Sequence, residues 1–278
     1  MDGSEFYERL DGFYAAGDAA GAYAFLRARR GEALERGDRA LLLTVDNALI
    51  GHCRENVIFD EVEGYYREAL DCIEALDLHG THAEATTFLN AATAFCVMGR
   101  SGESEALYDA AEALYRRILP PNDPYMAAMF NNRGLLLRAQ GRPAAAYASF
   151  QKALEVLNAC ADAEAETAAT YLNLASVSPD VPTGEAHLAA AAPYFASPDG
   201  GQDIHRFTAL ATAAELKYRK GDYAAAGRGF EETAAAWNKA GGAPQRRAVL
   251  LRNALKSYEK AGDAAAAARI RAETEEAP

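Results

Sequence analysis

Apolar residues recur at the three- and four-residue spacing of amphipathic α-helices along nearly the whole chain. No stretch shows the alternation of apolar and polar residues between hairpin turns that marks a half-buried strand. Breaks rich in Gly, Pro, Asn and Asp separate the helical stretches. We therefore expect an all-α chain of about seven helix pairs in a single repeat domain over residues 1–278. The pairs are placed near 4–36, 38–77, 81–118, 123–158, 163–196, 203–239 and 243–275.

One tight turn recurs between the two helices of a pair. A glycine follows an apolar helical stretch and precedes an alanine-rich one, at Gly17, Gly141, Gly221 and Gly262. Glycine readily takes the left-handed conformation that ends a helix. The next residue is an aspartate in three of these turns, and its carboxylate can accept hydrogen bonds from the N–H groups that open the second helix. These aspartates are Asp18, Asp222 and Asp263.

The joints between pairs carry further helix signals. Thr81 and Glu84 have the spacing of a capping box, and Asp123 precedes a proline suited to the first helical position. Residues 177–203 are irregular, because they contain Pro179, Pro182 and a Gly-Gly joint. We expect a shortened helix there and a bend between an N-terminal and a C-terminal half.

The units resemble tetratricopeptide repeats (TPRs). The fourth unit has the family's small residue, turn glycine, alanine, aromatic residue and alanine at Gly134, Gly141, Ala146, Phe150 and Ala153. The sixth unit matches at Ala214, Gly221, Ala226 and Phe230, and the seventh at Leu255, Tyr258, Gly262 and Ala267. The spacing of 42 residues between Gly99 and Gly141 exceeds the ~34 residues of a standard TPR and is similar to kinesin light chain repeats. The resemblance implies a right-handed superhelical solenoid (an α-α superhelix) whose concave groove binds peptides or proteins.

One position of the first helix is polar in every unit. It lies nine residues before the turn glycine at Asn90, Asn132, Asn253, Thr212 and Glu8, and the apolar pattern aligns Asn47 and Asn173 with them. Asparagine is a weak helix former, so its repetition at one register indicates a specific role. Stacked repeats place equivalent positions along one surface. By the resemblance, that surface is the concave groove.

The row of asparagines predicts peptide binding, because a carboxamide offers the donors and acceptor that match a peptide main chain. Side chains on the same face add apolar and charged contacts. The candidate peptide-binding residues are Asn47, Asn90, Asn131, Asn132, Asn173, Arg54, Thr93, Leu135, Arg138, Thr212 and Asn253. In an alternative interpretation, the asparagines bond to the neighbouring repeat and fix the stacking, and both roles can hold at once. Arg54 and Arg133 can likewise pair with surface carboxylates instead of a ligand.

Charge and motifs narrow the function. With 28 Lys+Arg against 40 Asp+Glu, the net charge of −12 disfavours nucleic acid and anionic membranes as partners. No apolar run reaches the ~20 residues of a membrane span, and the acidic N-terminal stretch does not resemble a signal peptide. Cys53, Cys72, Cys96 and Cys160 form no CxxC pair, and no metal-ligand cluster is evident. We expect reduced thiols, no metal or other cofactor, a cytoplasmic location and, from the high alanine content, a bacterial source.

The sequence contains no nucleophile elbow, phosphate-binding loop or dinucleotide fingerprint, so we expect a protein that is not an enzyme. The leading hypothesis is a TPR scaffold that holds an extended peptide or protein segment through its asparagines. Two alternatives stay open. One is a self-assembling structural or adaptor protein whose end repeats form a homodimer, and the other is a free-standing signalling-peptide receptor or regulator.

Overall fold

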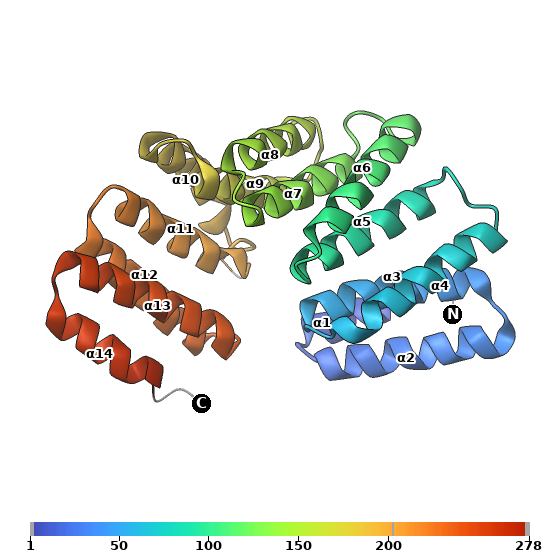
Figure 1. Cartoon of the computed structure of the whole chain (residues 1–278), viewed down its shortest axis with the longest axis horizontal. Coiled ribbons are helices and arrows are strands. Elements are labelled where there is room, and N and C mark those ends of the chain that lie inside the picture. Colours follow the sequence, from blue (N-terminus) through green and yellow to red (C-terminus); the bar gives the residue numbers. More distant parts are fainter. Residues whose placement is uncertain (1–2, 202, 276–278) are drawn as a thin grey trace. The chain divides into compact units, whose positions relative to one another are not determined.

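The computed structural model describes residues 3–201 and 203–275. Over these residues the chain forms the helices α1 to α14 and one short 3-10 helix, η1, and contains no strand (Figure 1). The predicted all-α class is confirmed. Short turns join consecutive helices into pairs, and the first helices of neighbouring pairs also pack together, as α3 does with α5 and α9 with α11.

The chain divides into two compact units, Met1–Leu136 and Leu137–Pro278. The first unit contains α1 (Gly3–Ala15), α2 (Ala19–Arg36), α3 (Arg39–Glu55), η1 (Phe59–Glu61), α4 (Val62–Ala75), α5 (His82–Val97), α6 (Ser101–Ile118) and most of α7 (Pro124–Ala139). The unit boundary therefore lies inside α7. Figure 1 shows these helices from blue to green.

The second unit contains the end of α7 and all later helices. They are α8 (Pro143–Leu157), α9 (Glu164–Val177), α10 (Val181–Phe195), α11 (His205–Arg219), α12 (Tyr223–Lys239), α13 (Pro244–Ala261) and α14 (Ala264–Glu275). The irregular segment 177–203 lies within this unit. A bend in that segment stays a prediction.

The turns within pairs have the predicted chemistry. The glycines 17, 141, 221 and 262 have φ of +69°, +70°, +88° and +74°. The Asp222 carboxylate accepts a hydrogen bond from the Ala225 N–H at 3.2 Å, and Asp18 and Asp263 make the equivalent bond at 2.8 and 3.0 Å. Each turn thus ends one helix and begins the next through residues adjacent in sequence.

One helix end was not predicted, and another differs from the prediction. In the second pair the left-handed residue is Val57, with φ of +61°, although a β-branched residue is unfavourable there. The predicted capping box at Thr81 is wrong, because the Thr81 hydroxyl donates to the Leu78 carbonyl at 2.6 Å and caps no N–H group. The Glu84 carboxylate instead accepts from the Gly80 N–H at 2.6 Å.

Close packing within a pair depends on one small residue, five positions after the turn glycine. This residue is fully or almost fully buried in each of the five pairs concerned: Ala22, Ser104, Ala146, Ala226 and Ala267. A small side chain lets the second helix approach the first closely, and larger residues one turn further along, such as Leu26 and Phe150, are buried as well. The Ser104 hydroxyl uses this proximity to donate to the Ala92 carbonyl at 2.7 Å.

Candidate functional site

The asparagines of the first helices do not share one environment. Asn47 on α3 donates through its amide nitrogen to the Leu43 carbonyl at 3.0 Å and to Thr87 Oγ1 at 2.9 Å. Its Oδ1 accepts from the Asn90 amide at 3.0 Å. Both ends of the Asn47 carboxamide are therefore engaged, and they join α3 to α5. For this pair of asparagines the contacts are those of the stacking interpretation.

The later asparagines keep their amides available. Asn132 in the first unit, and Asn173 and Asn253 in the second, are half-buried. None of these three side chains forms a hydrogen bond to a described residue of its own unit. Asn131, beside Asn132 on α7, is also half-buried. Three of the predicted positions thus present a donor and an acceptor that the fold does not use.

Two predicted residues meet in one pocket of the second unit. Thr212 of α11 and Asn253 of α13 line an open cavity of about 260 Å³. The other lining residues are Thr208, Ala211 and Glu215 of α11, Phe230 of α12, and Arg246, Val249 and Leu250 of α13. The buried Phe230 and Leu250 contribute apolar surface to the pocket, and the threonines, Glu215, Arg246 and Asn253 contribute polar groups. Such a mixture can take an apolar side chain and bond to the main chain that carries it.

Arg246 is the most informative lining residue that the sequence analysis missed. Its guanidinium donates to Thr208 Oγ1 at 2.6 Å and lies over the Trp237 ring, 4.7 Å from the centroid. Among the residues that the structure describes, no carboxylate pairs with it. Burial lowers the pKa of Arg246 below its usual range. Its position, seven residues before Asn253 and so two helical turns away, was the signal that could have identified it.

The flanking candidates are engaged to different extents. The Thr93 hydroxyl contacts the Leu89 carbonyl at 2.8 Å and the Tyr108 hydroxyl at 3.0 Å. Arg54 pairs with Glu55 at 2.6 Å, and Arg138 donates to Ser176 Oγ at 3.1 Å. Leu135 is half-buried.

Arg133 lies beside Asn132 on α7. It pairs with Asp109 at 2.6 Å and with Glu112 at 2.5 Å. The interpretation of Arg133 as an arginine paired to surface carboxylates is therefore confirmed.

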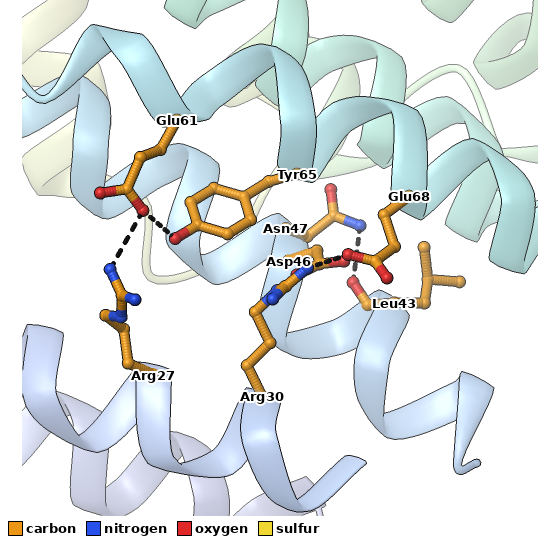
Figure 2. Close-up of polar contacts among 8 residues, drawn as sticks. All are labelled: Arg27, Arg30, Leu43, Asp46, Asn47, Glu61, Tyr65 and Glu68. Carbon is orange, nitrogen blue, oxygen red and sulfur yellow. Dashed lines mark hydrogen bonds and ion pairs between the residues drawn. The ribbon is translucent and has the colours of Figure 1, made fainter. Parts of the chain in front are cut away.

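A polar cluster next to Asn47 was not predicted (Figure 2). Arg30 of α2 donates to Asp46 Oδ1 of α3 at 2.9 Å and also pairs with Glu68 of α4. Asp46 is 0% exposed, and its Oδ2 has no hydrogen-bond partner among the described residues. Burial raises the pKa of Asp46 to about 6, and Arg30 offsets part of that effect.

The Arg30 guanidinium lies 5.2 Å from the centroid of Tyr65, whose hydroxyl donates to Glu61. The cluster thus links α2, α3 and α4, as Figure 2 shows.

Over residues 3–201 and 203–275, no helix is long and apolar enough to cross a membrane. The same residues contain no group of three His, Cys, Asp or Glu side chains placed to hold a metal ion. The four cysteines are free thiols, with Cys53 and Cys72 buried.

Comparison with known proteins identifies the repeats. The tetratricopeptide repeat family model matches residues 83–159, which span α5 to α8. No curated protein sequence matches the chain significantly.

Many solved structures resemble the chain, including the following three. RapI in its apo form is 11% identical with a TM-score of 0.64, over 97% of this chain and 75% of RapI. Nearly identical TPR-like repeats assigned to a kinesin light chain of Podosopora anserina are 14% identical with a TM-score of 0.58, over 71% of this chain and 95% of theirs. A tetratricopeptide repeat protein from Parabacteroides merdae is 18% identical with a TM-score of 0.52, over 94% of this chain and 92% of its own. At these identities the likeness concerns the fold alone.

Proposed function

Because the tetratricopeptide repeat family model matches residues 83–159 and the fold is that of tetratricopeptide repeat proteins, we propose that this chain holds an extended peptide or protein segment against the first helices of its repeats. Tetratricopeptide repeats are generally non-catalytic scaffolds that bind peptides or proteins. In the proposal, carboxamides of the first helices bond to the main chain of the bound segment. Apolar and charged neighbours select its side chains.

The pocket around Asn253 and Thr212 carries the proposal. These two residues occupy equivalent positions of successive first helices, and both line the same cavity. The Asn253 carboxamide has no hydrogen bond to other described residues, so it can pair with an N–H and a C=O group of an incoming chain. An extended peptide exposes both groups, because it lacks internal hydrogen bonds.

The other asparagines divide between two roles in the proposal. Asn132 in the first unit presents a free carboxamide as Asn253 does, with Asn131 and Leu135 on the same helix. Asn173 does so in the second unit, which also contains Arg138. Asn47 serves the fold, since both of its polar atoms are bonded within it. Arg54 and Thr93 flank the surface and keep their internal contacts.

The test compares Asn253 with Asn47, because the same substitution should act differently at the two sites. Peptides are first selected from a displayed random library on the full chain, and one is titrated by fluorescence anisotropy. Asn253→Ala should weaken its binding about tenfold, the equivalent of one or two hydrogen bonds, without changing the melting temperature. Asn47→Ala should lower the melting temperature, because it removes the hydrogen bonds that join α3 to Thr87 and Asn90 of α5, and should leave binding unchanged.

A reversed result would contradict the proposal. If Asn253→Ala lowers stability while peptide affinity stays the same, the residue stabilises the fold. If no peptide is enriched, main-chain capture is not the function. Self-assembly through the end repeats and a signalling-peptide receptor or regulator stay predictions, which sedimentation across protein concentrations and partner identification can test.

A further inference from the structure

One face of α13 carries cations that the fold leaves without counter-charges. Arg246, Lys256 and Lys260 lie seven residues before, three after and seven after Asn253, so all four residues share a helical face. We call Arg246, Lys256 and Lys260 the α13 basic face. None of the three forms an ion pair with a carboxylate in the part of the chain that the structure describes.

Nearby arginines behave differently. Arg247 on another face of α13 pairs with Glu273, and Arg271 of α14 pairs with Glu259 at 2.6 Å. Arg269 of α14 pairs with both carboxylate oxygens of Glu231. Carboxylates therefore pair with the cations on the other faces of these helices, and no described carboxylate pairs with a cation on the face that contains Asn253.

Aromatic rings hold two of these cations in place without neutralising them. The Arg246 guanidinium lies 4.7 Å from the Trp237 centroid, and Lys256 Nζ lies 5.3 Å from the centroid of Tyr218 on α11. Cation–π contact orients a charge but leaves it positive. The half-buried Arg246 has also lost part of its hydration without gaining a counter-ion. A carboxylate that enters the pocket would supply one.

The difference in net charge between the two units also favours an acidic ligand in this pocket of the second unit. Acidic residues outnumber basic ones by 23 to 12 in the first unit, but only by 17 to 16 in the second. An acidic ligand is therefore repelled far less by the second unit. The pocket contains one opposing charge, the exposed carboxylate of Glu215 on α11.

We propose that the occupant of the pocket between α11 and α13 is an acidic peptide segment, whose carboxylate side chains pair with Arg246 and Lys256 while Asn253 bonds to its main chain. The inference rests on the proposed function and specifies its ligand class. Arg246 and Lys256 set the preference for acid, and Glu215 limits the affinity.

The test uses two fluorescent probes that differ only in charge, a capped peptide of alternating Asp and Ala and its Asn and Ala counterpart. By anisotropy, the Asp probe should bind the full chain about tenfold more tightly than the Asn probe, as charge-assisted hydrogen bonds predict. Arg246→Gln and Lys256→Gln should each remove much of that difference and leave the Asn probe unchanged. Lys239→Gln, the same charge change at an exposed site on α12, should have little effect.

Glu215→Gln gives a change of the opposite sign. Removal of this carboxylate should strengthen the Asp probe about threefold, without affecting the Asn probe, because a like charge no longer faces it. A misfolded variant can only weaken binding, so a gain at residue 215 together with a loss at residue 246 cannot come from damage to the fold.

Each remaining outcome has a distinct meaning. Equal affinity for both probes, or an Asp preference that survives Arg246→Gln and Lys256→Gln, overturns the acidic ligand but leaves main-chain capture intact. Asn253→Ala should weaken both probes by the same factor. If neither probe binds at the highest attainable protein concentration, both the ligand class and the proposed function fail.

Discussion

Asp46 and Asn47 are neighbours on α3, yet their polar atoms are satisfied to very different degrees. Asn47 bonds through both ends of its carboxamide. Asp46 is fully buried and bonds to Arg30 through one oxygen only, as far as the described residues go. Loss of hydration disfavours the ionised form of Asp46 more than the hydrogen bond and charge of Arg30 favour it. The pKa of Asp46 therefore rises from 3.8 to about 6.

This raised pKa predicts a loss of stability with rising pH. Below 3.8 the Asp46 carboxyl is protonated whether the chain is folded or unfolded, and its contribution is complete; that contribution is lost as the pH rises through about 6. The shift corresponds to at most about 3 kcal/mol. Urea unfolding between these pH values should show the slope in the wild type. Asp46→Asn, which does not titrate, should flatten it, whereas the exposed Asp60→Asn should not. The same slope in all three proteins would show that another group titrates.

Among the elements, the second helix of each pair is the part most sensitive to side-chain volume. Its position five residues after the turn glycine contacts the first helix closely, and Ala226 there is 0% exposed. Gly227 next to it is equally constrained, since a Cβ at this position would lie 2.7 Å from the Tyr258 ring. The alanines and glycines of α12 are therefore packing residues as well as helix formers.

Ala226→Leu should lower the free energy of unfolding by about 1–3 kcal/mol, because the added atoms have no space without a shift of α11 against α12. Ala235 lies on the same helix but is exposed, so Ala235→Leu should change stability by less than about 0.5 kcal/mol. Chemical denaturation of the two variants measures the difference. If both variants lost a similar free energy of unfolding, the cause would be helix propensity and not packing against α11.

The sequence predicted those helix ends that depend on adjacent residues. Gly221 and Asp222 form their turn locally, and the structure has the expected φ and cap. Val57 could not be predicted, because a β-branched residue rarely takes positive φ and nothing in its type signals it. Thr81 was misread for a different reason, since its hydroxyl has a competing acceptor close by in the sequence, the Leu78 carbonyl.

The site was predicted at the level of the helix face. Periodicity placed Thr212 and Asn253 at equivalent positions, and both line one pocket. Periodicity does not specify which atoms lie across the helix interface, so the bond from Asn90 to Asn47 and the unpaired Arg246 could not be derived from it. A row of identical residues therefore contains both structural members and free ones.

At the scale of the whole molecule, stability is distributed along the repeats, because each helix pair contacts mainly its neighbours. The end helices α1 and α14 pack mainly on α2 and α13, with only side-chain contacts to a further helix, such as Tyr14 to His52 of α3 and Arg269 to Glu231 of α12. Inner helices such as α5 and α12 pack on more than one. The ends should therefore open at lower free energy than the inner pairs.

Hydrogen exchange can test this gradient. Amides of α1 and α14 should exchange well before those of α5 and α12, at a pH where the folded state predominates. Uniform protection from α1 to α14 would indicate that the chain opens only as a whole, and would contradict nearest-neighbour stability.

Trp237 is the one tryptophan of the sequence. Its indole N–H donates to the Ala243 carbonyl at 2.9 Å, Phe207 meets its ring edge-on, and the Arg246 cation covers one face. Indole emission responds to the electric field across the ring, and Arg246, which lines the pocket, is a charge next to that ring. Neutralisation of Arg246 by a ligand should therefore shift the Trp237 emission, and ultraviolet fluorescence would report occupancy of this cavity without a label.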